Sequence, residues 1–113
     1  MGASILAGRD RMDLDNGMSL RLLSALEVLQ ARREAEELAQ SERERALCSN
    51  ACLLSRALET QEGEPVFSSG REVLSGLRVE EIAALAGTWS RFNREENPGL
   101  TMEAEQVEDV KKN

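Results

Sequence analysis

The chain has 113 residues and a formal net charge of −7, and aromatic residues make up only 3% of it. This length suits a single domain, and a core poor in aromatics must be built from Leu, Ala and Val, which favours helices packed on helices. The acidic balance argues against direct binding to nucleic acid, because a run of phosphates needs many cations. Residues 95–113 hold six acidic residues and two lysines, so −4 of the charge lies there and −3 in residues 1–94.

The residue types that commonly carry catalysis or bind metals are scarce. The chain has no His and no Tyr, and its only lysines are Lys111 and Lys112. Cys48 and Cys52 are spaced i, i+4, which predicts two small apolar side chains on one face of a packed helix, and reduced thiols suit a cytoplasmic protein. We therefore expect no enzyme activity, no cofactor and no metal site. No apolar run is long enough to predict a membrane span.

The first long helix is predicted from Ser19 to Gln40. Its first half is densely apolar, and its apolar residues cover most of the helix circumference: Leu20, Leu22, Leu23, Ala25, Leu26, Val28 and Leu29. We expect this half to be buried on several sides, either in the domain core or in an interface. The second half is polar, and Arg32–Glu36 and Arg33–Glu37 have the spacing of i, i+4 ion pairs on an exposed helix.

A second helix is predicted to run to about Thr60. Ser41 and Glu44 have the spacing of a capping box, so this helix either starts there or continues the first one. Its apolar positions form a stripe at helical spacing: Leu47, Ala51, Leu54 and Leu58. Gly63 ends this element, and Pro65 favours an extended connection after it.

Two more helices are expected in the second half of the chain. A short one follows a second capping box that starts at Ser69, and Gly76 closes it. The last helix is predicted over Val79–Asn93, with Trp89 and Phe92 on its apolar face. These two aromatic residues are interpreted as core, with the alternative that they anchor a partner protein.

The two ends of the chain carry weak structural signals. Residues 1–17 show no clear period and are expected to form a flexible leader. Pro98 and Gly99 stop regular structure, and residues 98–113 contain few apolar side chains, which predicts a disordered acidic tail. The expected fold is therefore an all-α domain over residues 18–97, with about four helices: two long, one short and one of medium length.

From Ala46 to Leu100 the sequence resembles a known family. The stretch ALCSNACLLSRALE is followed by EPVFSSGREVLSGLRVEEIAALAGTWSRFNREENP. Together they resemble tail assembly chaperones encoded by phages and prophages of Gram-positive bacteria, and the arginine-rich LQARREAEELA of Leu29–Ala39 is also similar to that group. The resemblance covers about two-thirds of the chain. One departure is Arg78, where a Thr or Ser cap before the last helix would be usual.

The resemblance implies a function in the assembly of phage tails. Such chaperones coat the tape measure protein, recruit tail tube subunits, work in the cytoplasm of the bacterial host and are absent from the mature virion. The over-apolar first helix and the aromatic edge of the last one are the candidate partner-binding residues, namely Leu22, Leu26, Leu29, Trp89 and Phe92. A homo-oligomer is also compatible, because so short a chain leaves much apolar surface unburied.

Two alternatives of other classes stay open. The first is a small acidic phage or bacterial inhibitor that presents carboxylates as a mimic of phosphates, and such a mimic needs an ordered acidic face. The second is a structural component of the head–tail region, which would persist in purified particles. An enzyme comes last.

Overall fold

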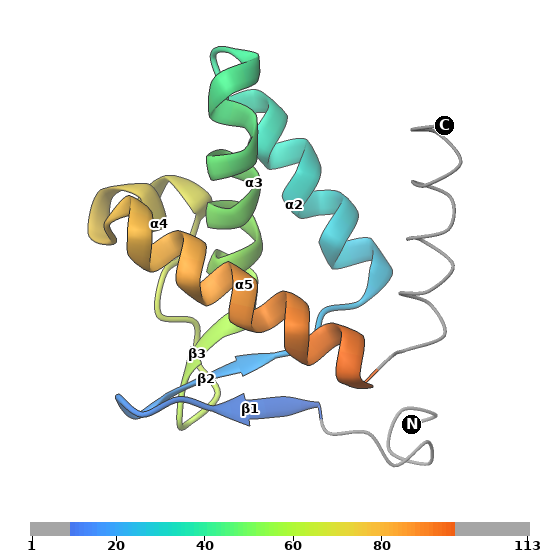
Figure 1. Cartoon of the computed structure of the whole chain (residues 1–113), viewed down its shortest axis with the longest axis vertical. Coiled ribbons are helices and arrows are strands. Elements are labelled where there is room, and N and C mark those ends of the chain that lie inside the picture. The colour runs from blue at the N-terminus through green and yellow to red at the C-terminus, as the bar shows by residue number, and fades with distance from the viewer. Residues whose placement is uncertain (1–9, 97–113) are drawn as a thin grey trace.

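In the computed structural model of the chain, residues 10–96 are described. They form a three-stranded antiparallel sheet, ordered β1-β2-β3, and four helices. The helices lie together on one side of the sheet, and α3 is in the middle of the helical layer (Figure 1). The elements in chain order are β1 (Arg11–Asp13), β2 (Met18–Arg21), α2 (Ala25–Leu38), α3 (Glu42–Ala57), β3 (Leu58–Thr60), α4 (Gly70–Gly76) and α5 (Val79–Glu96).

The prediction of an all-α fold is wrong, because a β-hairpin stands where the first helix was expected to begin. The turn between β1 and β2 is Asp15-Asn16-Gly17, with Gly17 at φ +82°. The Leu14 amide donates to the Met18 carbonyl at 2.8 Å, which closes a three-residue hairpin loop whose last position requires a positive φ. Residues 10–17, which we expected in a flexible leader, therefore form β1 and this turn. Residues 1–9 lie outside the described residues.

The strand period also explains the density of apolar residues that suggested a long helix. Leu20 points into the core from β2 and is fully buried, whereas its neighbour Arg21 points to the other face of the sheet. The helix starts only at Ala25, where the Ser24 hydroxyl accepts from the Glu27 amide and the Glu27 carboxylate accepts from the Ser24 amide. This reciprocal capping box fixes the first turn.

The second predicted helix ends three residues early, because Leu58–Thr60 pairs with β2 as the third strand. Leu58 lies opposite Leu20 in that pairing and is buried beside it. Of the two alternatives left open at Ser41, a new helix does start there: Ser41 is the N-cap of α3, but its side chain makes no capping hydrogen bond. The Glu44 carboxylate instead accepts from the Gln40 amide at 2.9 Å.

The last two helices confirm the sequence prediction. Ser69 caps α4 and Gly76 is its last residue. The helix α5 begins at Val79 and runs three residues further than expected, to Glu96. Arg78 stands where a Ser or Thr cap would be usual, and the Glu81 carboxylate accepts from the Arg78 amide at 2.8 Å, which is the half of a capping box that the third helical residue supplies. The predicted tail, residues 98–113, lies outside the described residues.

The main core lies between the sheet and the helices that surround α3. Its buried members come from β2, α3, β3, α4 and α5: Leu20, Ala51, Leu54, Ala57, Leu58, Val73, Ile82 and Trp89. The Trp89 indole N–H donates to the Arg21 carbonyl at 2.8 Å. This bond ties α5 to β2 across 68 positions of sequence and satisfies the one polar atom of a buried tryptophan.

The face of the sheet opposite this core carries a charged cluster. Arg11 of β1 lies directly opposite Arg21 of β2, and like charges so placed repel. The Glu59 carboxylate of β3 lies between them, with Oε1 at 2.9 Å from Arg11 Nη1 and Oε2 at 3.0 Å from Arg21 Nε. Glu59 is 7% exposed, so its charge is held by these two arginines.

The interface between α2 and α3 is built from small side chains. Ala31 and Ala35 of α2 pack against Cys48 and Cys52 of α3, and all four are buried. Both cysteines are free thiols, which confirms the prediction of small apolar residues at a helix interface. Burial raises the pKa of the Cys52 thiol to about 12 and also raises the pKa of Cys48.

We expect Cys48 and Cys52 to resist thiol reagents in the native protein. A thiol reacts as its thiolate. Burial disfavours loss of the thiol proton and also keeps the reagent away from the sulfur. At pH 8, labelling of the folded protein with a thiol reagent that releases a chromophore should therefore be slow. It should become fast when urea unfolds the chain, and the absorbance of the chromophore measures the rate. A Ser90→Cys variant adds a thiol at an exposed position of α5 and should label at once. Equally fast labelling of the native wild type would contradict the packing of this interface.

Candidate functional site: an exposed leucine face on α2

The helix α2 buries two small side chains and leaves two of its leucines on the outside. Ala31 and Ala35 are 2% exposed and face α3, whereas Leu26 is 58% exposed and Leu29 is 46% exposed. Leu22, in the segment before the helix, is half-buried. We call Leu22, Leu26 and Leu29 the leucine face. Leu26 and Leu29 are spaced i, i+3 on α2, so both side chains can contact one partner helix, and Leu22 lies in the segment that leads into α2.

The N-terminal end of this face is held rigidly. The Arg21 guanidinium contacts both oxygens of Glu27, with Nη1 at 3.1 Å from Oε1, and Nη1 also donates to the Leu22 carbonyl at 3.2 Å. The same Glu27 completes the capping box with Ser24. The start of α2 is therefore fixed to β2, and the leucine face is presented by a preformed element.

The Glu27 carboxylate titrates abnormally because of these contacts. Hydrogen bonds from the Arg21 guanidinium and from the Ser24 amide outweigh desolvation and lower the pKa of Glu27 from 4.5 to about 2. A carboxyl whose pKa is lower in the folded state stabilises the fold above its unfolded pKa, and this contribution is lost as pH falls through the folded value. Glu27 therefore helps to hold the leucine face in place at neutral pH.

We expect Glu27→Gln to lower the free energy of unfolding by about 2 kcal/mol at pH 7, after allowance for its partial exposure. Gln can keep the capping hydrogen bonds but not the charge. The difference from wild type should shrink as pH falls from about 4.5 to 2, because both proteins then lack the carboxylate. Urea denaturation at several pH values measures it, and a gap that does not change with pH would refute the assignment to Glu27.

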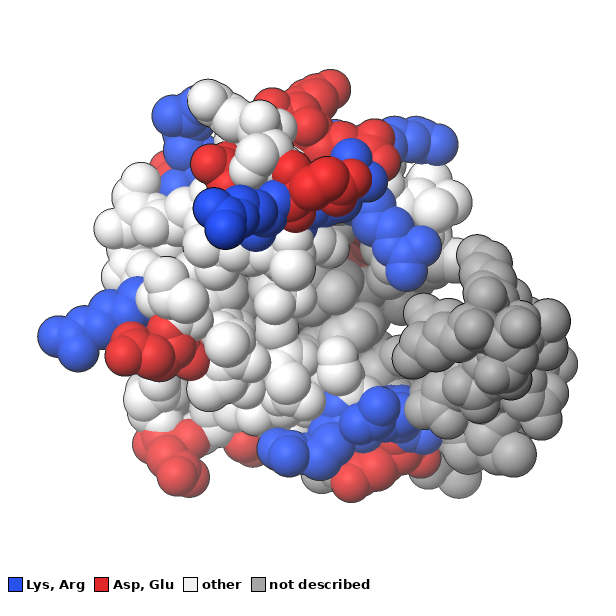
Figure 2. All heavy atoms as spheres, turned by 45° about the horizontal axis from the view of Figure 1, so that its top comes forward, with Lys and Arg blue, Asp and Glu red and all other residues white. Residues whose placement is uncertain are grey.

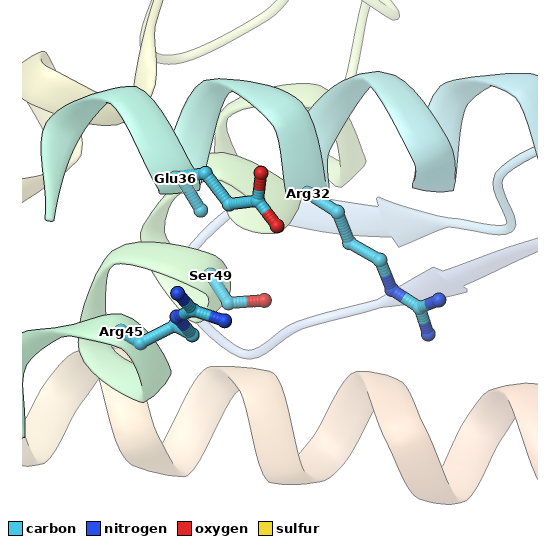
Figure 3. Close-up of a pocket in the computed structure, with 5 residues that line it drawn as sticks. Arg32, Glu36, Arg45 and Ser49 are labelled. Carbon is cyan, nitrogen blue, oxygen red and sulfur yellow. The ribbon is translucent and has the colours of Figure 1, made fainter. Parts of the chain in front are cut away.

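Beyond Leu29, the outward side of α2 becomes charged and borders a groove. A hollow of about 240 Å³ lies between α2 and α3, lined by Arg32, Ala35, Glu36, Arg45 and Ser49. In Figure 3 the guanidinium of Arg32 points away from the Glu36 carboxylate, and Arg45 lies on the Ser49 side of the groove. The predicted pairs Arg32–Glu36 and Arg33–Glu37 are not among the ion pairs formed within residues 10–96. Arg32 and Arg33, three and four residues after Leu29, are in none of these ion pairs, so their guanidiniums are open to a partner's carboxylates.

The two aromatic candidates lie elsewhere. Trp89 is 6% exposed and Phe92 is 1% exposed, so the structure places both in the core, as the first interpretation of them held. Trp89 helps to position β2 through its hydrogen bond to the Arg21 carbonyl, but neither aromatic residue is on the surface with Leu26 and Leu29. Of the five candidate residues, Leu26 and Leu29 are exposed on α2, and Leu22 precedes that helix and is half-buried.

A second hollow, of about 410 Å³, lies beside the charged cluster of the sheet. Its charged lining residues pair with one another: Arg21 with Glu59, and Arg56 with Glu34 at 2.8 Å. Glu34 also accepts from the Gly70 amide at 2.9 Å, so it joins α2, α3 and α4. These charged side chains stabilise the fold by forming ion pairs with one another. Sequence analysis missed this layer, although the alternation of Arg11, Asp13, Ser19 and Arg21 with apolar residues is a strand signal.

Comparisons with models of protein families, with curated proteins and with solved structures gave no match. Within residues 10–96, no helix combines the length and apolar character that crossing a bilayer requires.

Proposed function

We propose that this chain is a tail assembly chaperone that binds the tape measure protein and recruits tail tube subunits during assembly of a phage tail. It acts in the cytoplasm of the bacterial host and does not remain in the mature virion. The resemblance over residues 46–100 suggests this class, and the leucine face supplies a surface with which such a protein can bind.

The single observation that supports the proposal most is the exposure of Leu26 and Leu29. A leucine side chain gains about 1.5–3 kcal/mol when it is moved from water to a buried site, and here two adjacent ones are left in water on a rigid helix. The fully buried residues of the same helix are Ala31 and Ala35, which pack against α3. This arrangement suits helix-in-groove binding of a long apolar partner that would aggregate if left uncovered. Many copies bound along one partner would hold by avidity.

The charge layout supports a partner helix rather than an inhibitory acidic surface. On the face of the molecule that Figure 2 shows, acidic and basic side chains are mixed around a broad uncharged area. A phosphate mimic needs a continuous acidic face. On α2, Arg32 and Arg33 follow the leucine face directly, so the partner segment we expect is an amphipathic helix with carboxylates beside its apolar stripe.

The test is co-expression of the full chain with the tape measure protein encoded downstream in the same genome. Wild type should keep that protein soluble and elute with it as a complex in size-exclusion chromatography. Leu26→Asp and Leu29→Asp should each abolish the complex, because a carboxylate would be buried against the apolar stripe. Both substitutions lie at exposed positions, so folding should change by no more than about 0.5 kcal/mol.

The matched control is Val79→Asp. Val79 is 62% exposed at the start of α5, away from α2, and its replacement introduces the same charge without touching the leucine face. It should leave the complex intact. The proposal fails if wild type neither solubilises nor binds the tape measure protein, or if the leucine variants bind it as well as Val79→Asp does.

A further inference from the structure

The sheet has one edge that no other described strand covers. In the order β1-β2-β3, the outer side of β3 is bridged at Glu59 by Pro65 of the following loop. On the outer side of β1, no strand within residues 10–96 pairs with Arg11–Asp13, and in Figure 1 this strand is the outermost one at the bottom of the molecule. Uncovered strand edges are templates for pairing with another chain.

The hydrogen bonds of the hairpin show which groups point outward from β1. The Leu14 amide donates to Met18 at 2.8 Å, and the Leu22 amide donates to Asp10 at 3.0 Å. Met12 lies opposite Leu20, halfway between these two pairs. Hydrogen-bonded and non-hydrogen-bonded positions alternate along antiparallel strands. The amides and carbonyls of Arg11 and Asp13 therefore point away from β2, toward the uncovered side.

The side chains at those two positions are self-complementary. Arg11 and Asp13 lie on the same face of the sheet, two residues apart. If a second copy of β1 adds in antiparallel register about a two-fold axis at Met12, each Arg11 lies directly opposite Asp13 of the other copy. Residues 11 and 13 are also the ones whose backbone groups face outward. Backbone and side chains thus select the same register.

The state of the two side chains agrees with such a contact. Both residues are exposed, and Asp13 makes no ion pair within residues 10–96. Arg11 contacts Glu59 through Nη1, and its side chain stays 40% exposed. Charges that merely protect an edge work by repelling a second copy, whereas an alternating Arg and Asp attract it.

We propose that β1 is a self-association edge, through which two copies of this chain join their sheets into one continuous antiparallel sheet. The partner is a second copy, and the leucine face on α2 is not part of the contact. Because the strand is short, the dimer is weak and depends on concentration.

The experiment is sedimentation velocity of the full chain over a wide range of concentration. Wild type should shift from monomer toward dimer as concentration rises. Asp13→Arg should weaken association at least tenfold, because it places two guanidiniums opposite each other at both ends of the pairing, and it leaves the Arg11–Glu59 contact in place. Arg11→Asp should have the same effect through facing carboxylates, with its folding checked by circular dichroism.

Mixing the two variants gives the deciding result. In a mixed dimer the Arg11→Asp chain presents two carboxylates and the Asp13→Arg chain presents two guanidiniums, so every facing pair is attractive. The mixture should dimerise although neither variant does so alone. Asp15→Arg, the same charge change in the turn, and Leu26→Asp should both dimerise like wild type. A wild type that is monomeric at every concentration, or a mixture that stays monomeric, overturns the proposal and leaves the chaperone function untouched.

Discussion

Replacing Gly70 by Ala should lower the free energy of unfolding by about 3 kcal/mol. Gly70 opens α4 where that helix crosses α3, and a Cβ at this position would lie 3.1 Å from the Cys52 Cα and 3.2 Å from the Cys52 amide nitrogen, with the Cys52 sulfur nearer still. Backbone atoms cannot move aside as a flexible side chain can, so the two helices must separate. Separation also strains the hydrogen bond from the Gly70 amide to Glu34.

A second glycine supplies the matched control for this prediction. Gly87 lies within α5, and a Cβ there would meet nothing within 4 Å. Gly87→Ala should therefore stabilise the protein by about 0.5–1 kcal/mol, because alanine is more favourable than glycine in a helix interior by about that free energy. Urea denaturation measures the free energy of unfolding of both variants, and the same glycine-to-alanine change should lower it at position 70 and raise it at position 87. Equal stabilities of Gly70→Ala and wild type would show that α4 does not approach α3 as closely as described.

The prediction on Gly70 depends on a contact that the sequence could not reveal. The capping box at Ser69 predicts where α4 begins, but not that its first residue lies against Cys52. Local signals were sufficient for α4 and α5 because each has a cap and a clear apolar period. They gave no account of which helix each one touches, since those contacts join residues far apart in sequence.

The hairpin was missed for a different reason. The strands are three and four residues long, too short for alternation to outweigh the apparent helical period of Leu20 to Leu29. The Asn16-Gly17 turn was the available signal, since this dipeptide favours a tight hairpin. The prediction of one helix over the whole apolar run grouped residues whose environments differ. Leu20 is 0% exposed, whereas Leu26 is 58% exposed.

The surface position of the candidate residues was predicted in part, and their binding of a partner stays a prediction. The excess of leucines at the start of α2 suggested an interface, and the structure leaves Leu26 and Leu29 on the surface. The two aromatic residues of the five candidates lie in the core, and the Trp89 N–H donates to the Arg21 carbonyl, on a strand that the sequence analysis did not predict. The leucine face and the β1 edge belong to different elements, so variants of each can be tested without disturbing the other.

Removing the carboxylate of Glu59 should cost about 3 kcal/mol. Without it, Arg11 and Arg21 face each other across β1 and β2 with no charge between them, and the Arg21 Nε loses its acceptor at 3.0 Å. The contact to Arg11, although 2.9 Å long, lacks hydrogen-bond geometry at Oε1, so it acts through charge. Glu59→Ala should therefore unfold at markedly lower urea than wild type.

Salt separates this electrostatic account from a simple loss of packing. The repulsion between two arginines weakens as ionic strength rises, so the stability gap between Glu59→Ala and wild type should narrow from low salt to 1 M. Glu62→Ala removes an exposed carboxylate three residues along the same segment and should change stability by no more than about 0.5 kcal/mol at any salt. A gap for Glu59→Ala that is independent of salt would mean that Glu59 holds the sheet by its volume and not by its charge.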